Sequence, residues 1–541
     1  QTILSYGPNA DDKYITSYFR KTFMVDNAEQ IQTLLVNLKR DDGAIVYLNG
    51  SEIIRENMPM GPVNYDTYAL DAVASDEEEN FINFSFSGDL LIDGLNIIAI
   101  EIHQVSGSSS DLSFDFELLG EIYAEVELID TVTFNHQITD VSFGRDIETN
   151  IWGFFGEPTP GLPNHSSVVL DLETSEEIQF SLESGYYNEP QTVELYVAED
   201  SAQIFYTLDG SRPDSDANIY HNPINIETTT VLKARSIALN KLPGKIISKT
   251  IFISEQNFLP SISLIAEPKT LWDEDIGIYE NEFKQREIPV TIEYFKPEQG
   301  LKFTANVGAR LGGLNIWTKP QKPFTIYTRD RFGEDFINYQ LFENKQIANF
   351  SKIVFRNGGD DWEETLIRDP MTESLVSDFM ECGYMAYAPA SLFLNGSYWG
   401  IYNIREKFNN NYFSNNFNIS PNNIDHLEYT ITQAGTQLLV VQGSQDNYNE
   451  LLHYIQNNDL NNIIAYDHIK DWMNIDSFID HLIMIIFSAN TSWEHNREWW
   501  RSTEENGKWN WLIVDLDRGF DIINSYRNLL DNLMEDYKLF Q

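Results

Sequence analysis

The sequence is poor in cysteine, in basic residues and in long apolar runs. Its single cysteine, Cys382, has no partner for an intramolecular disulfide and lies in an apolar run, which predicts a buried, unreactive thiol. The chain has 36 lysines and arginines against 83 aspartates and glutamates, a formal net charge of −47, and no basic cluster. This excludes nucleic acid as a partner, because binding its phosphate backbone requires a local basic patch. No apolar run reaches the length of about 18 residues expected of a membrane span, so none is predicted.

The acidic composition is typical of secreted or salt-adapted proteins, and we expect a secreted or cell-envelope location. The chain begins at Gln1 with neither a methionine nor a signal peptide, which we interpret as a processed chain. Its 541 residues exceed what a single hydrophobic core supports, so several domains are predicted.

Residues 1–120 are predicted to form a β-sandwich. Strand-like runs such as 44–48 end in turn signals such as Asn49-Gly50, and residues 95–103 and 112–118 are rich in β-branched or alternating apolar residues. The segments DDGAIVYLNG and GLNIIAIEIHQ resemble jelly-roll modules of the galactose-binding or lectin-like type. That resemblance implies a fold and leaves the ligand open.

Two further segments precede the C-terminal half. Residues 121–165 end in a stretch rich in proline and glycine, 158–164, and resemble the end of a bacterial lamin-tail-type module, here a remnant or linker. Residues 166–256 include YTLDGSRPDSDANIY and TTTVLKARSIALNKLPGKI, which closely resemble the immunoglobulin-like domain at the C-terminus of chitobiases. In that family the domain is usually a spacer, so we expect a structural role. A polysaccharide or cell-surface ligand for the β domains is the alternative.

From residue 257 to 541 the pattern changes to mixed α and β. Residues 322–328 predict a strand. Asp369-Pro370 predicts a helix start, because aspartate caps a helix and proline fits its first turn, and this helix should run to about Cys382. Residues 474–490 predict a second helix. Its apolar stripe consists of Ile475, Phe478, Ile479, Leu482, Ile483 and Ile486.

The most informative segment is NTSWEHNREWWRSTEENGKWNWLIVDLDRGF, residues 490–520. A hydrophobic strand, 511–514, runs into Asp515-Leu516-Asp517. Two carboxylates at positions i and i+2 reach one ion where a strand breaks into a loop, and oxygen ligands suit Mg²⁺ or Mn²⁺. Taken alone, Asp-x-Asp is a weak signal, because it is common in turns.

Several motifs precede that segment in a fixed order: GIYEN (277–281), KPQKPFTIYTRDRFG (319–333), FRNGGDDW with LIRDP (355–370) and ASLFLNGSYWGIYNIREK (390–407). Together they resemble the spore coat protein H (CotH) family of atypical kinases. The resemblance implies a multidomain fold class: two all-β sandwich domains followed by an α+β atypical, protein-kinase-like domain. It also implies transfer of phosphate from ATP to protein serine or threonine. The family usually continues with a further helical region, so we expect this domain to be shortened at its C-terminus.

The resemblance also implies roles for individual residues, with ATP and Mg²⁺ or Mn²⁺ as cofactors. Lys322 would neutralise phosphate charge and Glu406 would pair with it, the alternatives being a surface lysine and an ordinary ion pair. Trp509 would stack on adenine, or would belong to the core. The metal would be held by Asp515, Asp517 and Asn496. A structural ion-pair network is the interpretation for Arg356, Asp360, Arg368 and Asp369.

One position departs from the family pattern. Many members have Asn-Thr-Asp-Trp where this chain has Ser492 in place of the aspartate, the presumed catalytic base, and a serine does not accept a proton near neutral pH. Either His495 or Glu494 takes over, or the base is dispensable because positioning and charge neutralisation dominate, or the protein binds nucleotide without transferring phosphate. Asp515, His495 and Ser492 are therefore the candidate catalytic positions.

The leading hypothesis is a secreted atypical kinase acting on a protein acceptor. One alternative is a catalytically impaired kinase-like scaffold in a surface or polysaccharide-binding protein. A second alternative is another nucleotide-dependent transferase on the same fold.

Overall fold

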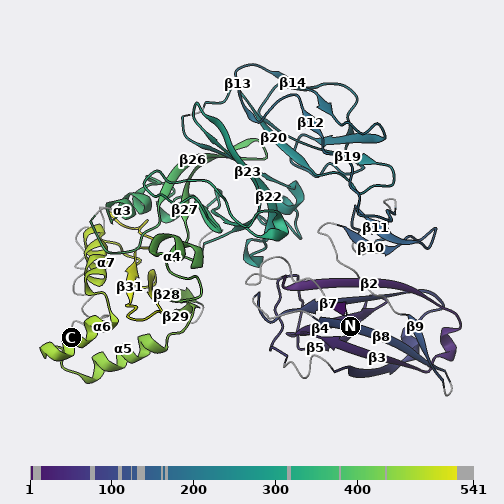
Figure 1. Ribbon diagram of the computed structural model, residues 1–541, viewed down its shortest axis with the longest axis horizontal. Helices are drawn as coiled ribbons and strands as arrows, with labels where there is room; N and C mark the ends of the chain where they lie inside the picture. The colour runs from purple at the N-terminus through teal and green to yellow at the C-terminus, as the bar shows by residue number, and fades with distance from the viewer. Residues whose placement is uncertain are drawn as a thin grey trace.

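The computed structural model describes residues 2–3, 14–73, 80–107, 113–122, 125–130, 141–159, 162–164, 168–256, 258–313, 319–376, 379–432 and 435–520. Over these residues the protein is mostly β, with few helices, and is divided into several domains (Figure 1). Two β domains lie on one side, a β-barrel lies in the middle, and a lobe with helices lies on the other side. In this described part, every helix is too short or too polar to span a membrane.

The N-terminal domain is a sandwich of two antiparallel sheets, as predicted, with strand orders β2-β7-β4-β5 and β1-β8-β3-β6. Asn49 and Gly50 have positive φ angles of 52° and 82°, which suits the tight hairpin that their sequence predicts. Strand β9 pairs with β8, so the sheet continues past the expected boundary at residue 120. The strands are β1 (Thr2–Ile3), β2 (Thr16–Val25), β3 (Thr33–Arg40), β4 (Gly43–Leu48), β5 (Ser51–Glu56), β6 (Ile82–Ser87), β7 (Gly94–His103), β8 (Ser113–Ile122) and β9 (Glu125–Asp130).

The connector, residues 121–165, contains a hairpin of β10 (Ser142–Arg145) with β11 (Trp152–Phe155). The second β domain is built on a five-stranded sheet of order β13-β20-β19-β16-β17, with two small two-stranded sheets beside it. Its strands are β12 (Gln179–Phe180), β13 (Gly185–Tyr187), β14 (Gln191–Val193), β15 (Leu195–Tyr196), β16 (Ala202–Thr207), β17 (Asn218–Ile219), β18 (Ile224–Ile226), β19 (Thr230–Ala238) and β20 (Ile247–Ile253).

The following seven strands close into a barrel of order β21-β22-β23-β24-β25-β27-β26. Apolar residues from every strand fill its interior, which accounts for the alternating apolar pattern of strands such as β24. The barrel strands are β21 (Ser261–Ala266), β22 (Ile288–Lys296), β23 (Gly300–Leu311), β24 (Phe324–Tyr327), β25 (Lys352–Arg356), β26 (Tyr387–Leu394) and β27 (Ser397–Glu406).

The C-terminal lobe combines a four-stranded sheet of order β29-β28-β30-β31 with helices. Buried tryptophans, including Trp499 and Trp511, form much of its core. The expected kinase-like arrangement of this half stays a prediction. The remaining elements are α2 (Pro268–Trp272), α3 (Arg368–Val376), α4 (Asn410–Phe417), β28 (Ile424–Thr432), β29 (Gly435–Gln442), α5 (Asp446–Asn457), α6 (Ile463–Trp472), α7 (Ile475–Ser488), β30 (Arg497–Ser502) and β31 (Asn510–Leu512).

The two helices predicted from sequence are present, with different details. Helix α7 begins after Asn474, whose side chain accepts a hydrogen bond from the Ser477 N–H, as an N-cap residue does. Helix α3 ends at Val376, before the predicted end near Cys382. The predicted apolar stripe on α7 is only partly right. Phe478 and Leu482 of the stripe are buried, but its isoleucines 479, 483 and 486 are exposed. Positions 481 and 485, which lie outside the predicted stripe, are buried as well. The helix is apolar around most of its circumference, so spacing alone did not decide which face is buried.

Candidate functional site

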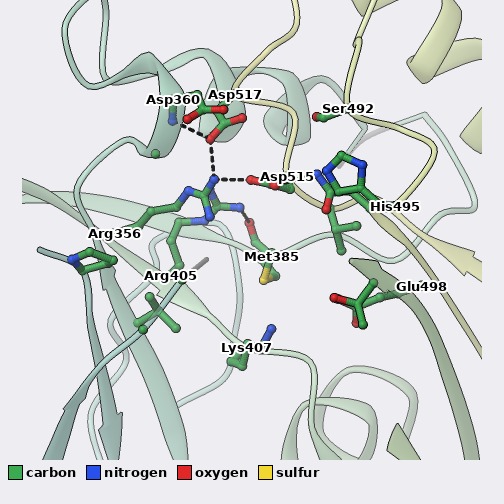
Figure 2. Close-up of a pocket in the computed structure, with 18 of the residues that line it drawn as sticks. Arg356, Asp360, Met385, Arg405, Lys407, Ser492, His495, Glu498, Asp515 and Asp517 are labelled. Atoms are coloured by element: carbon green, nitrogen blue, oxygen red, sulfur yellow. Dashed lines mark hydrogen bonds and ion pairs between the residues drawn. The ribbon is translucent and has the colours of Figure 1, made fainter. Parts of the chain in front are cut away.

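A cavity of about 380 Å³ lies between the barrel and the C-terminal lobe. One wall is the outer surface of β24, β25 and β27. The other wall comes from β28, β30 and residues 514–518, which follow β31 (Figure 2). This volume is within the usual range for small-molecule sites. Motifs far apart in the sequence therefore border one space.

Asp515 and Asp517 enter the cavity from a turn that we call the carboxylate turn (residues 515–517). Leu516 is fully buried in the lobe core, and Asp515 has left-handed backbone angles with φ of 53°. Anchoring the middle residue inward leaves both carboxylates on the cavity side. Both contact one nitrogen, since Arg356 Nη2 donates a hydrogen bond to Asp515 Oδ1 and lies 2.8 Å from Asp517 Oδ2 (Figure 2). The two predicted metal ligands thus converge on one point.

A buried ion-pair network holds the carboxylate turn in place. The Asp369 carboxylate accepts a hydrogen bond from the Leu516 N–H at 2.8 Å and pairs with Arg405 at 2.5 Å and with Arg356 Nε at 3.4 Å. Arg405 also pairs with Glu373 at 2.5 Å. The predicted cap role of Asp369 is therefore wrong: its carboxylate joins α3 to the carboxylate turn. The interpretation as a structural network is right for this residue.

The charges at the carboxylate turn depend on one another. Burial, together with the neighbouring Asp515 carboxylate, raises the pKa of Asp517 to about 7. Burial by itself disfavours the charged form of Arg356, but Asp515, Asp369 and Asp517 hold its pKa above the usual value. Among the residues that the structure describes, Arg356 is the one basic side chain that forms an ion pair with Asp515 or Asp517, so the turn keeps uncompensated negative charge. A further cation near the turn would be stabilised by that charge.

Asn496 lies beside Asp515, but its amide nitrogen faces the carboxylate, whereas a metal ligand would present the amide oxygen. Its Nδ2 is 2.6 Å from Asp515 Oδ2. Carboxylate and amide oxygens are ligands that Mg²⁺ and Mn²⁺ accept. An ion at this position would require Arg356 to withdraw from between the carboxylates and the Asn496 amide to turn its oxygen toward them. Over the part of the chain that the structure describes, no group of three or more His, Cys, Asp and Glu side chains forms a metal cage.

Ser492 and His495 also line the cavity. Ser492 is buried, and its Oγ donates to Asn490 Oδ1 at 3.0 Å, while Asn490 Nδ2 donates to the Asp515 carbonyl at 3.3 Å. Ser492 therefore supports the carboxylate turn from behind. His495 lies beside Asp515 in Figure 2, and its role as proton acceptor stays a prediction.

The predicted ion pair between Lys322 and Glu406 is wrong. Lys322 Nζ lies 2.9 Å from Glu282, and Glu406 lies 2.5 Å from Lys345 Nζ. Barrel closure brings the segment between β24 and β25, which carries Lys345, next to the end of β27. Glu406 borders the cavity, whereas Lys322 is not among the residues that line it.

The predicted stacking role of Trp509 is also wrong. Its ring is fully buried in the lobe core, and its Nε1–H donates to Asn447 Oδ1 at 3.0 Å. It does not line the cavity, so the alternative of a core tryptophan is correct.

Sequence reasoning missed two cations of the site. Arg356 belongs to the predicted ion-pair network through Asp369, but its direct contact with Asp515 and Asp517 was not predicted. The N–H of Asp360 donates a hydrogen bond to Asp517 Oδ2 at 2.9 Å. Lys407 lines the cavity with its amino group directed into it, and it makes no ion pair with any residue that the structure describes (Figure 2). The motif 390–407, which ends at Lys407, could have indicated this lysine, but the prediction selected the preceding residue, Glu406.

Two glutamates on the opposite wall were missed as well. Glu428 and Glu498 are direct cross-strand partners on β28 and β30. Burial and the Glu498 charge raise the pKa of Glu428. Against the effect of burial, Lys407 and the His426 ring, which lies 2.9 Å away, lower the pKa of Glu498. The cavity therefore has an acidic turn, an acidic strand pair and a lysine whose charge acts on that pair.

Residues 312–539 match the family described as CotH kinase protein, and residues 182–248 match the chitobiase/beta-hexosaminidase C-terminal domain. The chain carries a CotH kinase domain. The family match includes the carboxylate turn, Asn496 and the cavity-lining strands from β24 onward, so the cavity lies within the CotH domain. No curated protein matches the chain.

Solved structures show only weak likeness. The β-glucuronidase of Dictyoglomus thermophilum is 13% identical over 48% of this chain and 38% of its own, with a TM-score of 0.13. The β-glucuronidase of Faecalibacterium prausnitzii is 10% identical over 48% of this chain and 40% of its own, also with a TM-score of 0.13. The β-glucuronidase of Bacteroides uniformis is 12% identical over 59% of this chain and 28% of its own, with a TM-score of 0.15. The match spans less than half of each solved chain, and such TM-scores establish no shared fold.

Proposed function

We propose that the CotH domain transfers the terminal phosphate of ATP to a serine or threonine hydroxyl of a protein acceptor, using Mg²⁺ or Mn²⁺. The observation that carries this proposal is the convergence of Asp515, Asp517 and Asn496 in a cavity that also holds Arg356 and Lys407. Phosphoryl transfer needs little more than metal ligands, cations on the phosphates and a positioned acceptor. We further propose a secreted or cell-envelope setting, which the acidic composition favours.

The side chains of the cavity have distinct roles in this proposal. Asp515, Asp517 and Asn496 would hold the ion, which would neutralise charge on the phosphates when bound. Lys407 takes the role first expected of Lys322, because its ammonium group is directed into the cavity, whereas Lys322 does not line it (Figure 2). Arg356 preserves the carboxylate turn when no ion is bound, and it remains available to contact a phosphate oxygen once displaced.

The family-level likeness to protein kinases supports a two-part site with barrel residues on one wall and lobe residues on the other. The missing aspartate at Ser492 lowers the proton-accepting capacity of the site. We expect transfer to be slow for this reason, and we expect Ser492→Asp to accelerate it.

The test is incubation with ATP labelled at the terminal phosphate, Mn²⁺ and a panel of acceptor proteins, followed by gel and intact-mass readout. Asp515→Asn should abolish label transfer, whereas Asp476→Asn, an exposed carboxylate on α7, should not change it. Equal transfer by Asp515→Asn and wild type, or no transfer by wild type onto any protein including itself, would refute the proposal. An adenylate mass addition in place of phosphate would instead support a different nucleotide-dependent transferase.

A second candidate function is a kinase-like scaffold that binds nucleotide without transferring phosphate. The hydrogen bond of the Ser492 hydroxyl to Asn490 favours it, because this side chain supports the turn and does not act as a base. A rise in melting temperature with ATP and Mn²⁺, without label transfer, would identify this case.

A further inference from the structure

Positive charge gathers on one outer face of the barrel, beside the cavity. Arg310 on β23 is the cross-strand partner of Thr325 on β24, and Lys352 on β25 is the partner of Tyr327 on β24. Lys407 directly follows the end of β27, the strand that pairs with β25. Since neighbouring strands present paired positions on the same side, these cations share one face.

Tyr327 lies at the centre of this group, which we call the cationic face (Arg310, Arg329, Lys352 and Lys407). The Arg310 guanidinium is 5.2 Å from the ring centroid, Arg329 is 5.0 Å away, and the Lys352 ammonium is also 5.0 Å away. The ring itself is buried beneath them. Contacts with an aromatic face attract each cation weakly, so they do not balance the repulsion between cations.

Few carboxylates offset this charge. Glu287 is the acidic neighbour of the cationic face, and it already pairs with Arg329 at 3.4 Å and with Arg331 at 3.1 Å. On the cavity side, Glu428 and Glu498 act on Lys407. Neither Arg310 nor Lys352 forms an ion pair with a described residue, and Arg310 Nε is buried without a hydrogen-bond partner among those residues.

This arrangement is unfavourable for the folded protein by itself. Burial, followed by the charges of Lys407, Arg310 and Arg329, lowers the pKa of Lys352 to about 8. A cluster of cations is also unexpected from the composition, because the chain has 83 acidic residues against 36 basic ones. Uncompensated charge of this kind is typical of sites that receive a ligand of opposite sign.

We propose that the cationic face is a binding site for an oxyanion of the phosphate class, separate from the carboxylate turn and independent of a divalent metal. The Arg310 guanidinium supplies a planar fork of donors, and the two lysines supply point charges, which is the combination that suits a tetrahedral phosphate group. The anion has two sources with the same chemistry. It is either a small free phosphate compound or a phosphorylated residue of a protein. In both cases the anion would lie next to the cavity, because Lys407 belongs to the cationic face and also lines the cavity.

The test is a titration calorimetry and melting experiment on the whole chain in EDTA, at constant ionic strength. The probes are inorganic pyrophosphate and a phosphoserine peptide, the latter beside its unphosphorylated form. We expect at least one phosphate probe to bind, and we expect Lys352→Met combined with Arg310→Met to weaken that binding about tenfold or more, the usual effect of losing charge-assisted hydrogen bonds. Lys302→Met, on the same strand as Arg310, should leave binding unchanged.

The outcome is decisive because the variant is not expected to misfold. Removing Lys352 relieves repulsion, so Lys352→Met should melt at a higher temperature than wild type in the absence of phosphate. Binding by pyrophosphate alone identifies a small-anion site, and binding by the phosphopeptide alone identifies a site for phosphorylated protein. Failure of both probes to bind wild type, or equal binding by the double variant, would overturn the proposal. Neither result depends on phosphoryl transfer, so this site and the proposed function fail separately.

Discussion

Replacing Arg356 with methionine tests whether the carboxylate turn is built to receive a cation. The arginine contacts Asp515, Asp517 and Asp369, and methionine fills similar volume without charge. Removing one partner of a buried ion pair usually costs about 3–5 kcal/mol. The lower end, about 3 kcal/mol, applies here because Asp369 keeps Arg405 and Asp517 keeps the N–H of Asp360.

Thermal melting with and without Mn²⁺ is the assay. A loss of about 3 kcal/mol corresponds to a fall of roughly 6–12 °C in the transition of a domain of this size. An ion at a concentration one hundred times its dissociation constant stabilises the folded protein by about 2.7 kcal/mol. Because Arg356 occupies the position between the carboxylates, Mn²⁺ should stabilise Arg356→Met more than it stabilises wild type.

The control is Arg331→Met, which removes an ion pair from Glu287 but leaves that carboxylate with Arg329. It should show a smaller loss of stability and no enhanced response to Mn²⁺. If Arg356→Met is as stable as wild type without metal, or if Mn²⁺ raises its melting temperature no more than it raises that of wild type, then the arginine and the ion do not compete for one position, and the reasoning is wrong.

Three further predictions concern buried ionisable groups. Lys345→Met should lower the free energy of unfolding by about 3–5 kcal/mol in urea titrations, because it leaves Glu406 buried without its cation, and adding Glu406→Gln should recover part of the loss. The pKa of Lys352 is about 8 in the folded state against 10.5 in the unfolded chain, so the unfolded chain binds more protons between these two pH values. Wild type should therefore be less stable than Lys352→Met by about 3 kcal/mol below pH 8, and this difference should shrink as pH rises toward 10.5. A constant difference from pH 7 to 10.5 would contradict this. Burial raises the pKa of the Cys382 thiol well above its usual value, so a thiol reagent should react with it only on unfolding, and rapid labelling of the native protein would count against that burial.

Local features of the fold could be predicted from the sequence because they depend on neighbouring residues. Asn49-Gly50 specifies a hairpin turn through its tolerance of positive φ, and Asn474 specifies the start of α7 by capping it. The carboxylate turn belongs to the same class, because a buried leucine between two aspartates leaves both carboxylates on the other side. The predicted strand 511–514 is shorter in the structure, since β31 ends at Leu512. The ordered motifs of the CotH domain located the cavity segment before any geometry was available.

Tertiary structure decided which of these residues meet. Lys322 and Glu406 occur in neighbouring motifs, yet closure of the barrel gives each a different partner, because pairing between strands depends on register and not on motif order. Arg356 reaches the carboxylate turn across about 160 residues of chain, a separation that no local pattern encodes. Trp509 is buried because the lobe core closes over it, and a tryptophan in sequence is equally suited to a core or to a ligand. The sequence by itself therefore determined the residue types and turns of the site, and the packing of barrel against lobe determined which charges face one another.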